Sequence, residues 1–120
     1  VREVLGRPSV LPVRRCCGGG VSRTAEGVIK DMIKAVLKRH GVYFHMAVLN
    51  GMGAPSLDFI CCHNGRYFAV EAKKPGAKPT PRQEVTMNEI AFAGGYVFVV
   101  SCQDELDVLE AYLYLIGPNR

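Results

Sequence analysis

The sequence predicts a single α/β domain, with a mixed sheet flanked by helices and elements in the order α-β-β-β-α-β-α. A run of helical periodicity between residues 28 and 37 comes first, and Asn64-Gly65 then separates two strand-like runs. A capped helix from Thr80 is followed by the fully apolar run Tyr96–Val100, which is typical of a strand buried on both faces. A hairpin followed by a helix and a buried strand favours a sheet covered on both sides.

Length and composition are those of one domain with a hydrophobic core, since the chain has 120 residues of which 48 % are hydrophobic. Residues 1–20 begin without Met and contain Pro8, Pro12 and three consecutive glycines, so we interpret them as a disordered tail or an added arm. Residues 21–120 are predicted to form the folded domain. No apolar run approaches the roughly 18 residues of a membrane helix, and no signal peptide pattern is present, so a cytoplasmic protein is expected.

The charge is unevenly distributed along the chain. The net charge is +4, but the first 20 residues hold four of the 15 basic residues and one of the 11 acidic ones, which leaves 11 minus 10, or +1, for the rest. Basic residues of this remainder precede an acidic stretch that begins at Asp104. A locally basic face is compatible with nucleic acid binding, and ordinary solvated helix faces explain the same charges equally well.

The five cysteines show no spacing typical of a metal site. Cys16-Cys17 and Cys61-Cys62 are adjacent pairs, and no C-x-x-C motif is present. An odd count without a signal peptide predicts a reducing compartment, with Cys61 and Cys102 packed in the core. A zinc site at Cys62-His63 would need a second pair of ligands, which the sequence does not offer.

The first helix is predicted from apolar residues at helical spacing, with Ser22 or Thr24 as the N-cap and Gly41 after its end. Glu26 lies three residues before Ile29, so it projects from the apolar face of this helix. Two interpretations stay open: an acid that complements the helix dipole, or a carboxylate directed at the sheet.

The Asn-Gly turn predicts the register of a hairpin. Strands are expected at 43–49, 57–62 and 66–73, and the turn places His63 opposite Arg66 and therefore Asp58 opposite Glu71. Because directly opposed acids destabilise a sheet, a cation is expected between them, and Lys73 lies on the same face as Glu71. This grouping predicts a site for Mg²⁺ and a phosphate.

The following helix has a complete start signal. Thr80 is the expected N-cap, Pro81 takes the first helical position, and Gln83 completes a capping box, so Gln83 has a structural role whatever else it does. Gly94-Gly95 ends this helix, and an amphipathic helix closes the chain.

Taken together, these motifs resemble the PD-(D/E)XK nuclease superfamily, and more narrowly the stand-alone VRR-NUC domains of phages and bacteria. The resemblance rests on Gly53–Asp58, on Glu71-Ala72-Lys73 and on Pro79–Gln83, and it extends over roughly residues 26–100. In one respect the chain departs from the family, because Leu57 stands directly before the aspartate where the family often has Pro.

The resemblance implies a PD-(D/E)XK core and a site for Mg²⁺ or Mn²⁺. The implied metal ligands are Asp58, Glu71, the backbone carbonyl of Ala72 and, as a further candidate, Glu26. Lys73 would assist the attacking water or stabilise the charge on the phosphate, and Gln83 would orient a water or the scissile phosphate.

The implied activity is that of a metal-dependent DNA endonuclease that selects branched DNA, such as a Holliday junction, and acts as a homodimer. Lys74, Lys78 and Arg82 are the candidate DNA-binding residues. The final helix, with Tyr114 and Leu115, is either a dimer surface or an ordinary core helix. Two alternatives remain open: a catalytically weak nuclease fold that only binds branched DNA, and a small structural protein whose acids form surface ion pairs.

Overall fold

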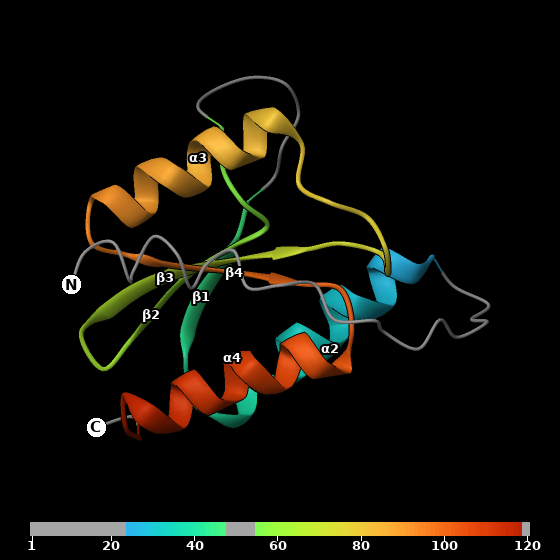
Figure 1. Cartoon of the computed structure of the whole chain (residues 1–120). Helices are drawn as coiled ribbons and strands as arrows, with labels where there is room; N and C mark the ends of the chain where they lie inside the picture. The colour runs from blue at the N-terminus through green and yellow to red at the C-terminus, as the bar shows by residue number, and fades with distance from the viewer. Residues whose placement is uncertain (1–23, 48–54, 119–120) are drawn as a thin grey trace.

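The computed structural model describes residues 24–47 and 55–118, and there it has the predicted α-β-β-β-α-β-α order (Figure 1). The elements are α2 (Ala25–Arg39), β1 (Tyr43–Met46), β2 (Phe59–His63), β3 (Arg66–Ala72), α3 (Pro81–Phe92), β4 (Tyr96–Val100) and α4 (Gln103–Leu115). The tail predicted for residues 1–20, and with it Ser22, lies outside the described residues. The first predicted strand is shorter than expected, because β1 ends at Met46; Val48 and Leu49 are also outside the described part.

The strands form one mixed sheet in the order β1-β2-β3-β4. The first two pairings are antiparallel and β3 pairs with β4 in parallel, as a strand–helix–strand connection requires. Asn64 and Gly65 both have positive φ, 52° and 81°, which is the geometry of a type I′ turn. His63 lies opposite Arg66 and Phe59 opposite Val70, so the predicted register is confirmed.

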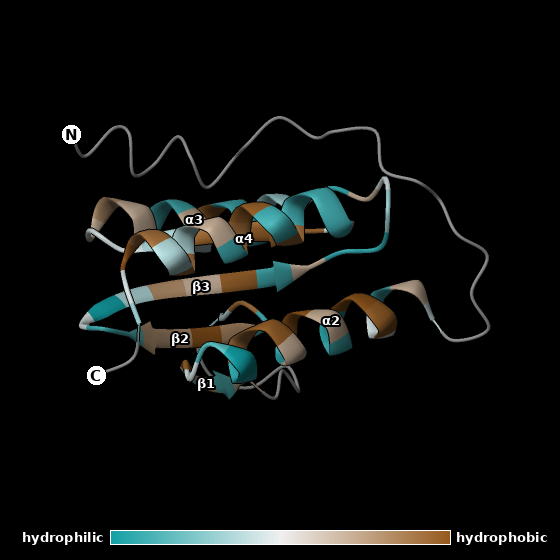
Figure 2. Ribbon diagram, turned by 90° about the horizontal axis from the view of Figure 1, so that it is seen from below, coloured by the Kyte–Doolittle hydropathy of each residue, from teal (hydrophilic) through white to brown (hydrophobic). Residues whose placement is uncertain are grey.

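Helices cover both faces of the sheet. Figure 1 shows α3 on one side and α2 with α4 on the other. Alternate residues of β3 therefore enter two separate apolar clusters: Phe68 and Val70 pack with α2 and α4, whereas Ala69 packs with Met87 of α3. Figure 2 shows the consequence, since β2 and β3 are apolar along their middle and hydrophilic at the hairpin turn. Sandwiching β3 in this way buries any polar side chain that it carries near its end.

The two helices that border the site begin as the sequence predicts. The Thr24 hydroxyl accepts a hydrogen bond from the Gly27 amide (3.2 Å) at the start of α2. At the start of α3, the Thr80 hydroxyl accepts from the Gln83 amide (3.2 Å), while the Gln83 side-chain oxygen accepts from the Thr80 amide (2.9 Å). The predicted capping box is therefore present, and it fixes the position of Gln83 on the first turn.

The final helix is partly core and partly surface. Tyr112 is buried against Phe68 and Phe98, whereas Tyr114 and Leu115 are 70 % and 82 % exposed. The far end of α2 is tied to this helix by Glu110, which accepts hydrogen bonds from Arg39 and His40; these bonds lower the pKa of the Glu110 carboxyl. The final helix therefore packs in the core through Tyr112, while Tyr114 and Leu115 lie on its exposed face.

The cysteines and His63 have structural environments. Cys61 is a buried free thiol whose pKa burial raises to about 12, Cys62 is free and exposed, and Cys102 is buried, so the predicted core positions of Cys61 and Cys102 are confirmed. His63 is buried, and its Nε2–H donates to the Gly117 carbonyl (2.9 Å), so it helps to hold the hairpin against the end of α4.

No helix within the described ranges 24–47 and 55–118 is long and apolar enough to cross a membrane.

Candidate active site

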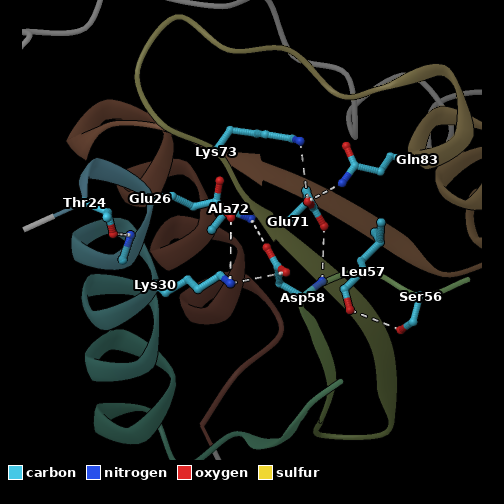
Figure 3. A network of polar contacts seen from close by, with 11 residues as sticks. Thr24, Glu26, Lys30, Ser56, Leu57, Asp58, Glu71, Ala72, Lys73 and Gln83 are labelled. Atoms are coloured by element: carbon cyan, nitrogen blue, oxygen red, sulfur yellow. Dashed lines mark hydrogen bonds and ion pairs between the residues drawn. The ribbon is translucent and has the colours of Figure 1, made fainter. Parts of the chain in front are cut away.

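The predicted site residues meet at one end of the sheet, where β2 begins and β3 ends. Figure 3 shows Asp58 and Glu71 there, with Lys73 and Gln83 on one side of Glu71 and Glu26 and Lys30 of α2 beside Asp58. The capped first turn of α3 and the first turns of α2 border the same sheet end. The fold thus gathers side chains from four segments that the sequence separates by up to 57 positions.

Asp58 and Glu71 are held together by crossed hydrogen bonds. The Asp58 amide donates to Glu71 Oε1 (3.1 Å), and the Ala72 amide donates to Asp58 Oδ2 (3.0 Å). The backbone pairing of β2 with β3 ends at Phe59 and Val70, and beyond it side-chain oxygens of Glu71 and Asp58 accept the amides. Each acid is therefore anchored through one oxygen, and its second oxygen remains for another partner.

Glu71 is the more buried of the two acids, at 3 % exposure. Its Oε2 accepts a hydrogen bond from Gln83 Nε2 (2.7 Å), so Gln83 caps its helix and contacts the acid at the same time. Burial first, and the nearby Asp58 carboxylate second, raise the pKa of Glu71 to about 7. A cation bound at this end would oppose both effects, because it favours the ionised carboxylate.

Two lysines, rather than one, flank the acid pair. Lys73 Nζ lies 3.8 Å from Glu71 Oε2, on the face that the alternation of β3 predicts. Lys30 Nζ lies 3.7 Å from Asp58 Oδ1 and also 3.7 Å from Glu26 Oε2. Sequence reasoning did not place Lys30 in the site, although its position four residues after Glu26 on one helix face was a usable signal.

Glu26 points toward the sheet but does not join the acid pair directly. Its carboxylate contacts Lys30, and the described residues contain no cluster of three His, Cys, Asp or Glu side chains that could hold a metal ion. The donor set that the structure does offer consists of two adjacent carboxylates beside the Ala72 backbone. Hard oxygen donors in this number fit Mg²⁺, which binds through one or two carboxylates and keeps water or phosphate in its other positions.

The candidate DNA-binding residues lie on the segment that joins Lys73 to Gln83. Lys74 and Lys78 are exposed on the loop between β3 and α3, and Arg82 is exposed on the first turn of α3. A cavity of about 510 Å³ lies elsewhere, at the opposite end of β3, where Arg66, Tyr67 and Tyr96 line it. No carboxylate is among the described residues that line this cavity. We therefore assign the candidate active site to the acid pair and not to the cavity.

The comparisons with known proteins agree with this geometry. No family model matches the chain. The chain is similar to a protein described as "Putative nuclease p44" from Acyrthosiphon pisum secondary endosymbiont phage 1, with 29 % identity over 86 residues, covering 72 % of this chain and 91 % of that protein. A solved structure described as "VRR_NUC domain" matches with a TM-score of 0.65 and 24 % identity, covering 75 % of this chain and 98 % of that one. The chain has the VRR_NUC fold.

The resemblance noted from the motifs is thereby confirmed at the level of the fold, including the mixed sheet and the order of elements. Within the VRR_NUC fold of this chain, the acid pair and Lys73 lie together at one sheet end, as the hairpin spacing predicted, and Gln83 joins them, as the resemblance implied.

The double role of Gln83 can be separated by Gln83→Glu. Glutamate preserves the capping box, but it replaces the donor to Glu71 with a second carboxylate. We expect this variant, without metal, to lose about 1–3 kcal/mol of unfolding free energy at pH 8 and less at pH 5, where Glu71 is protonated. Urea unfolding at both pH values measures this, with Gln83→Ala as the reference variant that removes both side-chain bonds of Gln83 without adding a carboxylate. If Gln83→Glu were as stable as wild type at pH 8, the hydrogen bond from Gln83 to Glu71 would be contradicted.

The raised pKa of Glu71 predicts a pH-dependent stability. Its ordinary value is 4.5 and its folded value about 7, so the folded state binds the proton more tightly between these values. The contribution of Glu71 to the free energy of unfolding is therefore fully present below about pH 4.5 and is lost as the pH rises through about 7. Over this range the free energy of unfolding falls by at most about 1.4 kcal/mol per pH unit.

In EDTA, we expect the unfolding free energy of wild type, relative to Glu71→Gln, to fall from pH 5 to pH 8. Magnesium at pH 8 should restore wild type more than the variant, because the variant keeps the Asp58 carboxylate but has no charge at position 71. Parallel pH profiles for the two proteins would show that Glu71 titrates as an ordinary carboxyl.

Proposed function

We propose that this protein is a metal-dependent DNA endonuclease that hydrolyses phosphodiester bonds. The observation that carries the proposal is the pairing of Asp58 with Glu71 beside Lys73 and Gln83 at the end of β3. Lysines compensate these acids in the structure, and two carboxylates gathered beside a backbone carbonyl are also a donor set that fits Mg²⁺. Similarity to a phage protein named as a nuclease supports the same proposal.

Asp58, Glu71 and the carbonyl of Ala72 would hold Mg²⁺ or Mn²⁺, and Glu26 would reach the ion only through a rearrangement of Lys30. When bound, the ion supplies a more acidic water and neutralises charge on the phosphate. Lys73, whose side chain is mostly shielded from solvent, provides a fixed positive charge where negative charge grows on the phosphate. Gln83 holds Glu71 in place and has a side-chain amide that can orient a water or the scissile phosphate.

Lys74, Lys78 and Arg82 would grip the phosphates that flank the cut. All three are exposed on the segment between Lys73 and Gln83, and contacts of this kind position DNA without reading its sequence. We therefore propose selectivity for DNA shape, with a Holliday junction or another branched DNA as the substrate.

Cutting two strands of a branched substrate requires two sites, which a symmetric homodimer would supply. Tyr114 and Leu115, exposed on α4, are the candidate contact between protomers. We propose that the enzyme acts in the cytoplasm of a bacterial or phage-infected cell. A module that holds branched DNA without cutting it is the alternative, and the cleavage experiment below distinguishes the two.

Cleavage should depend on both metal and Lys73. On a labelled panel of duplex, flap, single-stranded and four-way-junction DNA, we expect cutting with Mg²⁺ or Mn²⁺ and none in EDTA. Lys73→Ala should reduce the single-turnover rate about 10²- to 10³-fold, because it removes a fixed charge from the reacting phosphate. Lys38→Ala, in the last turn of α2, is the matched control for the loss of one lysine.

Two outcomes would change the proposal. Junction binding without cutting by wild type in either metal would favour the binding module. Undiminished cutting by Lys73→Ala would remove this lysine from the reaction, whereas paired symmetric cuts in the junction would support the homodimer.

The basic loop should contribute to affinity through salt-sensitive binding of phosphates. We expect the double variant Lys74→Ala/Lys78→Ala to bind junction DNA more weakly, and to reduce the slope of log affinity against log salt by about 0.9 for each phosphate that it no longer neutralises. Fluorescence anisotropy in EDTA at several salt concentrations measures this without cleavage. An unchanged slope, or an equal change in Lys38→Ala, would place the DNA on another surface.

A further inference from the structure

Lys30 occupies a position in the site that the proposed reaction does not explain. It lies on α2 one turn after Glu26, and its ammonium is equidistant, at 3.7 Å, from Glu26 Oε2 and Asp58 Oδ1 (Figure 3). The Asp58 side chain is only 12 % exposed, whereas those of Lys30 and Glu26 are 34 % and 44 % exposed. The ammonium therefore reaches from the surface into a more shielded carboxylate.

The oxygen that Lys30 contacts is the one that a metal ion would need. Asp58 Oδ2 already accepts the Ala72 amide, so Oδ1 is the oxygen left for a cation. Lys73, the other lysine, contacts Glu71 Oε2 on the opposite side of the pair. Two cations cannot share Asp58 Oδ1 at close range without strong repulsion, and a divalent ion doubles that repulsion.

Lys30 has an alternative partner when it leaves Asp58. Its unbranched side chain has several rotatable bonds, and Glu26 is more exposed than Asp58 and lies on the same helix. Glu26 can thus keep the ammonium near the site while Asp58 Oδ1 is released. This gives Glu26 a function that does not require it to touch the metal.

We propose that Lys30 is a built-in competitor of the metal ion: it occupies Asp58 Oδ1 in the metal-free protein and transfers to Glu26 when the ion binds. Lys30 thereby sets the metal affinity of the site and keeps the acid pair compensated in the absence of metal. The inference rests on the proposed function, because it takes Asp58 to be a metal ligand. Lys30 is a positioning residue in this scheme, since it acts through Asp58 rather than on the DNA.

The test is the affinity for Mn²⁺, measured without DNA from the electron paramagnetic resonance signal of the free ion. We expect Lys30→Met to bind Mn²⁺ roughly five- to tenfold more tightly than wild type, because the competing charge is removed. Lys30→Arg, which keeps the charge, should restore affinity to within about twofold of wild type on the same argument. Lys30→Gln provides a second neutral variant, and thermal unfolding confirms that each variant is folded.

Lys34→Met is the matched control. Lys34 lies one turn further along α2 and pairs with Asp31 at 3.9 Å, so this variant has the same change in net charge outside the site. We expect its Mn²⁺ affinity to stay within about twofold of wild type, because exposed charges are screened at moderate salt. If Lys30→Met and Lys34→Met bound Mn²⁺ more tightly to the same degree, the change in net charge alone would explain the effect and the proposal would be overturned.

The experiment also distinguishes failure of this inference from failure of the proposed function. Mn²⁺ binding that is abolished in Asp58→Asn but unchanged or weakened in Lys30→Met would overturn the role of Lys30 and leave the metal site intact. A wild-type protein that binds no Mn²⁺ would overturn both. Tighter Mn²⁺ binding in Lys30→Met and Lys30→Gln, with Lys30→Arg and Lys34→Met near wild type, would establish that Lys30 competes with the metal ion.

Discussion

The crossed hydrogen bonds that join Asp58 to Glu71 and Ala72 are the constraint on which the rest of the site depends. They bring two like charges together where the ladder of β2 and β3 ends, each carboxylate taking an amide of the opposite strand. Because one oxygen of each acid is fixed in this way, the directions of the remaining oxygens are fixed as well. Lys30 on α2, Lys73 after β3 and Gln83 on α3 contact those remaining oxygens, so three separate elements converge on one fixed pair of acids.

Because helices cover both faces of the sheet, the contact between Asp58 and Glu71 changes the pKa of Glu71. A carboxylate at the end of an open sheet would be solvated, and its neighbour would affect it little. Here α3 covers one face and α2 with α4 cover the other, so Glu71 is almost fully removed from water. The raised pKa of this acid is therefore a property of the layers of the fold as much as of its neighbour Asp58.

Local sequence signals predicted most of the fold and the centre of the site. The Asn64-Gly65 turn predicts the hairpin register by itself, and in the structure this register pairs Phe59 with Val70 and leaves Asp58 within hydrogen-bond distance of Glu71. Thr80 and Gln83 predicted the start of α3 from reciprocal bonds within four residues. Such signals succeed because their physics acts between near neighbours in the chain.

What the sequence could not predict depends on packing between distant segments. Its spacing from Glu26 places Lys30 on the same face of α2, but its contact with Asp58 depends on how that helix packs against the sheet. The depth of Glu71 likewise depends on α3 closing over the second face. Glu26 illustrates both cases, since its direction toward the sheet follows from helical spacing, but its contact with Lys30 instead of the acid pair follows from geometry.

The two simultaneous contacts of Gln83 have a consequence for how this position would vary through evolution. Its oxygen serves the helix cap and its nitrogen serves Glu71, so two independent selective pressures act on one side chain. Glutamate satisfies the first pressure and fails the second, and most other residues fail both. Invariance here would thus arise even in lineages that had lost catalysis but still required the helix start, so conservation alone would overstate the chemical importance of this residue.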